Sequence, residues 1–164
     1  MIHLASPNSN SSLSTFTQSQ VQPNAIDLRI DKLFRIKKMP FILTEEKKVH
    51  RGSEELTTGK EDYWYLYPGV YEILMEGTVK VAEDEAGFVI TRSTLNRNGV
   101  FITSGLYDSG YEGVMAGVMH VNCGNFWIQR GTRVGQFLLF KAESLSKYDG
   151  DYGVGKEHDK KYEG

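Results

Sequence analysis

Cysteine is almost absent from this chain, and its scarcity excludes two kinds of site. Cys123 is the only cysteine among 164 residues, so neither an intrachain disulfide nor a thiolate zinc site can form. Three of the four histidines, His50, His120 and His158, are scattered along the chain, and we expect none of these three to hold a metal. A single unpaired thiol suits a reducing cytosol.

Charge of one sign and long apolar runs are also missing. The net charge is −2 and no Lys/Arg block occurs, which argues against a protein of duplex DNA or of membrane surfaces. The purely apolar stretches are a few residues long, too short to cross a membrane, and no charged segment followed by an apolar run opens the chain. We therefore expect a soluble cytoplasmic protein (host cytoplasm for a viral one) that binds neither nucleic acid nor membrane.

The chain does contain a series of short segments rich in β-branched and aromatic residues. Gly and polar clusters separate them at intervals of about 8–12 residues, which is typical of a sandwich or barrel. Strands are expected at 27–30, 63–67, 70–74, 79–81, 87–91, 101–103, 113–121, 125–129 and 136–141, with one short helix at 93–97. The sequence therefore predicts a single all-β domain with jelly-roll-like connectivity, whose edges favour an oligomer.

Three segments differ in composition from this core. Residues 1–19 are rich in Ser, Asn, Thr and Gln and predict a flexible N-terminal arm or a strap over a neighbour. Residues 44–62 are polar and charged and predict an exposed insertion or a mobile loop. Residues 147–164 are Gly-rich and charged and predict a flexible C-terminal tail. The β domain itself is expected over residues 20–146.

Two segments carry candidate groups for an anion and for a cation. Asp27 lies inside a strand otherwise suited to burial, where it either caps backbone amides or faces a hydrated cation. Arg92 and Ser93 follow a strand and open a helical turn, which places a guanidinium, a hydroxyl and free N–H groups together, as phosphate binding requires. A plain N-cap would explain Ser93, but it would leave Arg92 and Arg97 without a role.

Two further segments are turns with chemically useful side chains. The glycines of 105–113 predict a tight hairpin from which Asp108 and Tyr111 project, and a carboxylate held there could orient a water for attack on phosphorus. Because Asp and Gly are common in hairpins, a purely structural turn is the alternative. In 131–136 a turn leads into a strand, where the Gln136 amide could donate to a phosphate oxygen.

In this order the four segments resemble the motif series of the dUTPase and dCTP deaminase superfamily, over roughly residues 20–155. Residues 22–29 resemble the first motif, 92–99 the second, 105–113 the third motif of dUTPases and 133–136 the fourth. The resemblance implies a β jelly-roll (dUTPase-like) protomer in a homotrimer, with active sites at the subunit boundaries.

The resemblance also implies a role for each matched residue. Asp108 would activate water and contact the deoxyribose 3′-hydroxyl, while Tyr111 would pack beneath the sugar and exclude a ribose. Asp27 would meet Mg²⁺ through its water shell, and the metal would bridge phosphate oxygens. Arg92, Ser93 and Gln136 would hold phosphates. The wider set of substrate-binding residues adds Thr94, Arg97, Gly105, Leu106, Tyr107, Tyr152 and Lys156.

The strand after the third motif separates the two branches of the superfamily. The resemblance implies a catalytic Glu there in dCTP deaminases, and a gap-free alignment puts Val118 at that position. No Glu or Asp lies between Gly113 and Val121, and valine cannot shuttle protons. We therefore predict hydrolysis of dUTP to dUMP and pyrophosphate, with dCTP as another substrate of the same scaffold. The alternatives are a dCTP deaminase, a bifunctional deaminase and dUTPase, or a non-catalytic nucleotide-binding module.

The tail departs from the Arg-Gly-rich fifth motif of dUTPases and resembles the deaminase tail more closely. Tyr152 could stack on the base and Lys156 could supply charge, but Asp149 and Asp151 would lie near a polyanion. We predict that the tail closes over the nucleotide.

Overall fold

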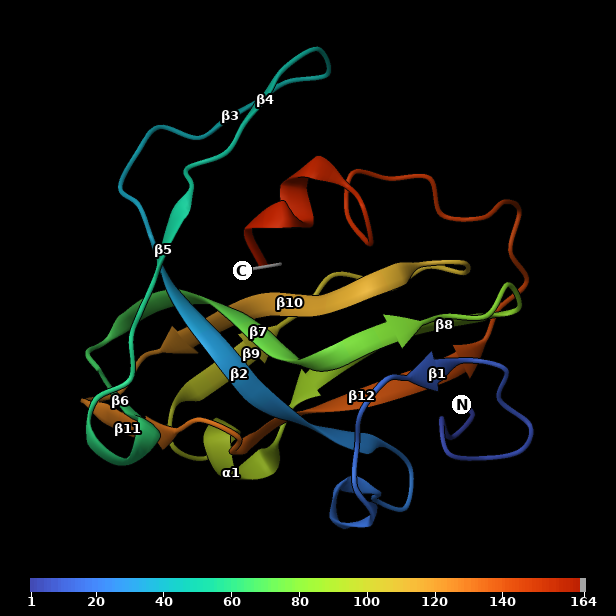
Figure 1. Cartoon of the computed structure of the whole chain (residues 1–164), viewed down its shortest axis with the longest axis horizontal. Helices are drawn as coiled ribbons and strands as arrows, with labels where there is room; N and C mark the ends of the chain where they lie inside the picture. The colour runs from blue at the N-terminus through green and yellow to red at the C-terminus, as the bar shows by residue number, and fades with distance from the viewer. Residues whose placement is uncertain (163–164) are drawn as a thin grey trace.

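Two long strands cross the middle of the fold and carry much of its core. In the computed structural model, which describes residues 1–162, β2 (Ile26–Ile36) and β7 (Gly69–Lys80) run antiparallel side by side (Figure 1). Ile30 and Met75 are paired across these strands, and both side chains are buried. Alternate residues of a strand point to opposite faces, so the apolar alternation that predicts strands also defines the interior of the barrel.

The main sheet pairs its strands antiparallel and almost closes into a barrel. Its order is β8–β12–β2–β7–β10–β9, with β8 (Glu85–Thr91), β9 (Val100–Thr103), β10 (Glu112–Val121) and β12 (Arg133–Lys141). The two edges meet because Thr91 Oγ1 donates to Ile102 O (2.9 Å) and accepts from the Ile102 N–H (2.7 Å). Gly87 and Tyr107 form a further bridge, at a point where a Cβ on Gly87 would lie 2.6 Å from Leu138 O. The all-β barrel fold predicted from the sequence is confirmed.

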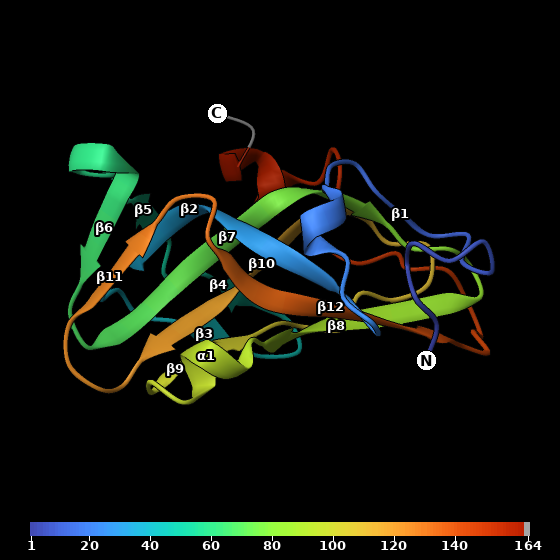
Figure 2. The same ribbon diagram turned by 90° about the horizontal axis from the view of Figure 1, so that it is seen from below.

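Shorter elements decorate this barrel. They are β1 (Ser12–Leu13), β3 (Ile42–Leu43), β4 (Lys48–Val49), β5 (Ser53–Glu55), β6 (Tyr63–Leu66), β11 (Phe126–Gln129), α1 (Ser93–Asn96), η1 (Gln18–Gln20), η2 (Lys60–Asp62) and η3 (Glu157–Tyr162). β6 pairs with β11 at one end of the barrel, as Figure 2 shows, and β3 pairs with β4 in a hairpin that extends away from it (Figure 1).

The predicted strands are present, with one correction in β7. Residues 70–74 and 79–81 were expected as two strands, but they belong to one strand with an irregularity between them. In the sequence, the polar stretch Glu76–Thr78 between them resembles a turn. In the structure Gly77 takes a φ of 85° there, and the pairing with β10 shifts register between Val114 and Met115. A β-bulge of this kind bends a strand without ending it.

Residues 1–19 lie against their own barrel. Leu4 and Leu13 are buried, and β1 pairs with β7. The carboxylate of Glu85 is also buried and accepts hydrogen bonds from the N–H of Asn10 (3.1 Å) and the hydroxyl of Ser9 (2.9 Å). These contacts hold the arm on its own chain; its predicted flexibility and its predicted contact with a neighbour stay predictions.

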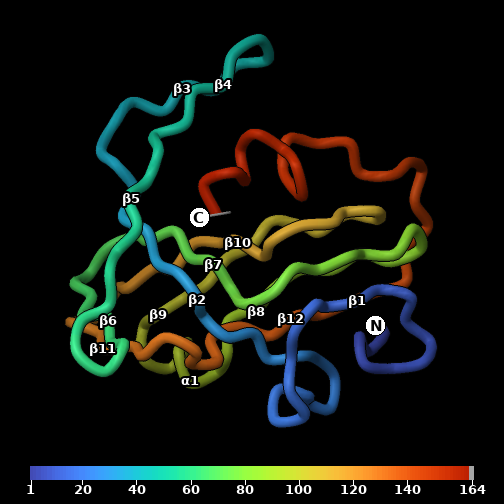
Figure 3. Tube along the Cα trace, in the orientation of Figure 1, coloured from blue at the N-terminus to red at the C-terminus, as the bar shows by residue number. Residues whose placement is uncertain are grey.

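The chain after β12 turns back along the barrel and ends in η3, above β10 in Figure 3. The Tyr148 N–H donates to Ser109 O (2.8 Å), and the Val154 N–H donates to Glu112 O (2.9 Å). The tail therefore runs beside the turn that precedes β10 and beside the start of that strand. The last two residues of the predicted tail, 163–164, lie outside the described residues. Within residues 1–162, no helix has the length and apolar character needed to cross a membrane.

Candidate functional site

One group of predicted residues meets where β2, β8 and β12 come together. Gln136 of β12 is paired with Asp27 of β2. The residue before it, Gly135, is paired on the other side of β12 with Thr91, the last residue of β8. Arg92 follows directly. Asp27, Arg92, Arg133 and Gln136 are called the arginine cluster below.

The arginine cluster is organised around one buried carboxylate. The Asp27 side chain is 0% exposed, and its Oδ2 lies 3.2 Å from Arg92 Nε and 3.3 Å from Arg133 Nη1. Gln136 Nε2 donates to Oδ1 (3.1 Å). The side chains of Arg92 and Arg133 remain 28% and 37% exposed, while Asp27 fixes the orientation of both guanidinium groups. Two cations against one anion give the cluster a net positive charge, which suits a phosphate.

Three predicted substrate-binding residues lie on the turn that follows Arg92. Ser93 and Thr94 begin α1 directly after Arg92, and both residues are exposed. Arg97 ends the same turn and is also exposed, with its N–H donating to Ser93 O (3.0 Å). The predicted helical turn is confirmed, and it extends the donor surface of the cluster.

The same geometry bears on the predicted metal role of Asp27. Both carboxylate oxygens accept from Arg92, Arg133 or Gln136, and the side chain has no exposed surface. In this protomer Asp27 is an ion-pair partner that positions arginines, and it does not face a hydrated cation. Within residues 1–162, no group of three or more His, Cys, Asp and Glu side chains is arranged to hold a metal. The metal role stays a prediction.

A second group of predicted residues lies on the turn between β9 and β10. Tyr107 and Tyr111 are buried with ring centroids 5.4 Å apart, and the Tyr111 hydroxyl donates to Val114 O (2.8 Å). Burial raises the pKa of both phenols, so both stay protonated at neutral pH. Asp108 lies between them in the sequence and is exposed, while Gly110 completes the turn with a φ of 80°. The two buried tyrosines therefore fix this turn on the barrel, while the Asp108 carboxylate between them is exposed to solvent.

Tyr107 and Tyr111 form one wall of a cavity of about 400 Å³, called the tyrosine pocket below. β10 forms its floor and the tail forms its opposite wall. It is lined by Glu72, Gly105, Leu106, Tyr107, Tyr111, Val114, Ala116, Gly117, Val118, Tyr148, Tyr152, His158, Asp159 and Tyr162. The structure therefore brings together five of the predicted substrate-binding residues, those of the turn and Tyr152 of the tail.

Asp108 and Lys156, the remaining predicted residues, line other cavities than the tyrosine pocket. Asp108 lines a neighbouring cavity of about 470 Å³, together with Lys147 and Asp149 of the tail. Lys156 lines a third cavity of about 980 Å³, beside the hairpin that carries β3 and β4, and its Nζ lies 3.6 Å from Asp149 Oδ1.

The turn that bears Asp108 and the arginine cluster are far apart in one protomer. Tyr107 is bridged to Gly87 near the start of β8, whereas Arg92 follows the end of the same strand, five positions further on. At about 3.3 Å per residue, the two points are roughly 17 Å apart. Asp108 and Arg92 therefore belong to two separate regions of one chain.

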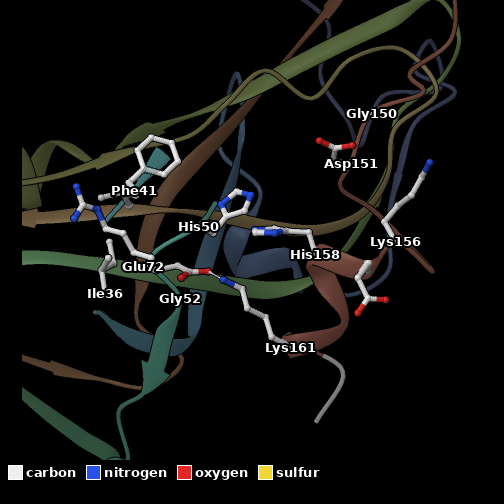
Figure 4. Close-up of a pocket in the computed structure, with 13 residues that line it drawn as sticks. Ile36, Phe41, His50, Gly52, Glu72, Gly150, Asp151, Lys156, His158 and Lys161 are labelled. Atoms are coloured by element: carbon white, nitrogen blue, oxygen red, sulfur yellow. Dashed lines mark ion pairs between the residues drawn. The ribbon is translucent and has the colours of Figure 1, made fainter. Parts of the chain in front are cut away.

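Glu72 is an acidic residue of the tyrosine pocket that the sequence motifs do not identify. Its side chain is 15% exposed, and its Oε1 lies 2.6 Å from Lys161 Nζ (Figure 4). The same oxygen accepts a hydrogen bond from the Tyr162 hydroxyl. Burial alone would raise the pKa of Glu72, but hydrogen bonds from Lys161, Tyr162 and Ser53 outweigh it and hold the pKa below its usual range. The available signal was an acid inside the apolar stretch 70–74, the pattern that singled out Asp27.

Asp159 of η3 is the other carboxylate of this pocket, and it too was missed. It is buried and accepts from the Gly153 N–H (2.7 Å), while burial raises the pKa of its carboxyl group. It lies in the charged tail, where nothing in the sequence distinguishes it from its exposed neighbours.

Comparison with known proteins agrees with the fold and with the superfamily that the motifs resemble. The family described as dCTP deaminase-like matches residues 3–142. A probable deoxyuridine 5′-triphosphate nucleotidohydrolase of Halobacterium salinarum is 33% identical over 137 residues, 81% of this chain and 82% of that protein. A probable enzyme of the same name from Methanopyrus kandleri is 34% identical over 140 residues, 83% of this chain and 89% of that protein.

Among solved structures, the 2′-deoxycytidine 5′-triphosphate deaminase of Agrobacterium tumefaciens shares the fold with a TM-score of 0.63 at 17% identity. The match covers 83% of this chain but spans 44% of that one. With the family match extending over most of the barrel and the two relatives aligning over four-fifths of the chain, this protein belongs to the dCTP deaminase-like family.

Proposed function

We propose that the protein hydrolyses dUTP to dUMP and pyrophosphate, at sites that form between the subunits of a homotrimer. The observation that carries the proposal is the division of the site. The arginine cluster and the Asp108 turn each have half of the groups that the reaction needs, and they lie roughly 17 Å apart in one chain. The relatives from Halobacterium salinarum and Methanopyrus kandleri, both named as dUTP nucleotidohydrolases, support this substrate.

In the proposed site the arginine cluster of one subunit holds the triphosphate. The exposed edges of Arg92 and Arg133 donate to its oxygens, with the Gln136 amide beside them and Ser93 at the start of α1. Because Asp27 already fixes both guanidiniums, little side-chain freedom is lost when the phosphates bind. The positive cluster also stabilises the charge that develops on the departing pyrophosphate.

The Asp108 turn comes from an adjoining subunit. The exposed Asp108 carboxylate takes a proton from a water whose oxygen forms the new bond to the α-phosphorus, while the bond to the pyrophosphate oxygen breaks. Tyr111, held by its hydrogen bond to Val114 O, packs against the deoxyribose and leaves no room for a 2′-hydroxyl. Backbone groups at Gly105 and Leu106 read the base from the wall of the tyrosine pocket.

Mg²⁺ is proposed as the cofactor, and each subunit would supply few of its ligands. No cage of carboxylates exists among the described residues, so most metal ligands would come from the triphosphate and from water, an arrangement typical of Mg²⁺. When bound, the metal would neutralise phosphate charge. Asp27 is the carboxylate that contacts Arg92 and Arg133, and its part would be to hold these two arginines in place beside the metal-bound phosphates.

Deamination of dCTP is the second candidate, favoured by the family description and by the fold shared with the Agrobacterium tumefaciens enzyme. It needs a group that shuttles protons at the base. Val118 lines the tyrosine pocket at the position where the sequence resemblance implies the catalytic Glu of deaminases, and its side chain cannot carry a proton.

The decisive experiment incubates the protein with dUTP or dCTP and Mg²⁺, and measures pyrophosphate and ammonia separately. We expect pyrophosphate from dUTP and no ammonia from dCTP. The Asp108→Asn variant serves as the control for a contaminating enzyme, since it should release no pyrophosphate. If the wild-type protein releases ammonia from dCTP and no pyrophosphate from dUTP, the proposal is wrong and dCTP deamination replaces it.

A further inference from the structure

Glu72 is the one residue of β7 that lines both the tyrosine pocket and the larger cavity of about 980 Å³ beside it. It is paired directly across from Val118 of β10, and residues opposite each other on antiparallel strands point to the same face. Its carboxylate is therefore presented toward the wall of the pocket where the tail passes. Neither the four motifs nor the proposed chemistry gives this acid a role.

The partners of Glu72 all come from outside the core of the barrel, and the two strongest come from η3. Lys161 Nζ lies 2.6 Å from Glu72 Oε1, and the Tyr162 hydroxyl donates to the same oxygen. Figure 4 shows the Lys161 side chain extending from the tail to Glu72. The Tyr162 ring also packs edge-on against Phe34 of β2 at 5.7 Å. The end of the described tail is thus fixed to two central strands of the barrel.

From η3 the restraint passes back to the part of the tail that lines the tyrosine pocket. Asp159 accepts from the Gly153 N–H (2.7 Å), and the Val154 N–H donates to Glu112 O (2.9 Å). At Gly153 a Cβ would lie 2.6 Å from Glu112 O, so the backbone there is pressed against the start of β10. Fixing η3 therefore also fixes the turn that presents Tyr152 to the pocket.

The buried carboxylate makes this attachment specific. With the tail in place Glu72 is 15% exposed, so its charge depends on compensation by Lys161 and by the Tyr162 hydroxyl. The ion pair between Lys156 and Asp149 has side chains that are 43% and 97% exposed, and exposed pairs of this kind contribute little. The contact with Glu72 therefore holds the tail more strongly than such an exposed pair does.

We propose that Glu72 is a positioning residue, which anchors Lys161 and Tyr162 so that the tail closes the tyrosine pocket over the bound nucleotide. The inference rests on the proposed function for its effect on turnover, but the contact between Glu72 and η3 exists independently of it. Glu72 contacts no reacting atom; it acts through the tail, and its loss should weaken the hold on the nucleoside more than the proton transfer at Asp108.

The test compares Glu72→Gln with a matched variant on the same strand, Glu76→Gln. For Mg²⁺-dependent dUTP hydrolysis we expect Glu72→Gln to raise KM and lower kcat/KM about tenfold with a smaller change in kcat, and Glu76→Gln to leave both unchanged. Hydrogen–deuterium exchange should speed up across residues 150–162 in Glu72→Gln and stay slow in β7 and β10.

A double-mutant cycle separates action through the tail from direct action in the pocket. In the Lys161→Gln/Tyr162→Phe background, Glu72→Gln should cause no further change in KM or in tail exchange, because its partners are already gone. Additive effects, or unchanged KM and unchanged exchange in Glu72→Gln alone, would overturn the anchor. If the wild-type protein releases no pyrophosphate from dUTP, the proposed function fails by itself, and the exchange measurements decide the anchor without it.

Discussion

The arginine cluster and the tyrosine pocket are built in opposite ways. The cluster lies on three adjacent strands of the barrel, and its members are fixed by one buried carboxylate, Asp27. The pocket has one wall on the barrel and the other on a tail that returns from the end of the chain. A strand-borne cluster keeps its shape before substrate arrives. A pocket closed by a tail can change shape, so under the proposed function we expect binding of the triphosphate and enclosure of the nucleoside to be separate events.

The largest effect should come from Asp108→Asn, which removes the proposed base and alters neither region's architecture. We expect kcat for dUTP to fall about a thousandfold, the middle to upper part of the range for a general base. Affinity for a non-hydrolysable dUTP analogue, measured by calorimetry, should change little. Glu112→Gln, on an exposed residue at the start of β10, is the control. Normal turnover in Asp108→Asn would refute the mechanism.

The next largest effect should come from Arg92→Ala, which disrupts the arginine cluster. Triphosphate affinity should fall roughly 10- to 100-fold, because a charge-assisted contact is lost and Arg133 is less constrained. The free energy of unfolding should also drop by about 1–3 kcal/mol, since buried Asp27 loses one partner. Arg130→Ala, which changes an exposed arginine near Trp64, is the comparison. An unchanged Kd for the analogue would remove Arg92 from the phosphate site.

Deletion of residues 147–164 removes the adjustable wall of the pocket. We expect kcat/KM for dUTP to fall about tenfold or more, with a smaller proportional change in the midpoint of urea unfolding. The Asp27 ion pairs are far from the tail in the fold, so inorganic triphosphate should bind to the truncated protein with its affinity retained. Wild-type kinetics in the truncated protein would show that the tail is not a lid.

The smallest effect concerns stability rather than catalysis. Burial alone would raise the pKa of Glu85, but hydrogen bonds from Ser11, Lys141, Asn10 and Ser9 lower it from 4.5 to about 2. Because the folded pKa lies below the unfolded one, this contribution is complete above pH 4.5 and is lost as the pH falls from 4.5 toward 2. Urea unfolding between pH 6 and pH 3 should show the loss, and Glu85→Gln should flatten that part of the profile. A profile identical in both proteins would contradict it.

The sequence predicts the two regions unequally, for a physical reason. The arginine cluster depends on strand pairing and on residues within a few positions of a strand end, so Asp27, Arg92 and Gln136 could be found from local pattern and motif order. Arg133 was named only as part of a motif, because its ion pair with Asp27 spans more than a hundred positions of the chain.

The tyrosine pocket depends on long-range contacts of the tail, which local pattern does not encode. Tyr107 and Tyr111 were found because their turn has a glycine signature. Glu72 and Tyr162 were missed because their contact joins positions 90 residues apart. The separation of Asp108 from Arg92 is likewise a property of register along β8, and only the structure shows its size.

Complementation between two impaired variants tests the division of the site between subunits most directly. Asp108→Asn and Arg92→Ala proteins are unfolded, mixed in equal amounts and refolded, and dUTP hydrolysis is measured at a substrate concentration below the wild-type KM. If the two regions meet across a subunit boundary, about a quarter of the sites in randomly mixed trimers combine an intact Asp108 with an intact Arg92, and about a quarter of the wild-type activity returns. Activity no greater than the average of the two variants refolded separately would contradict a shared site.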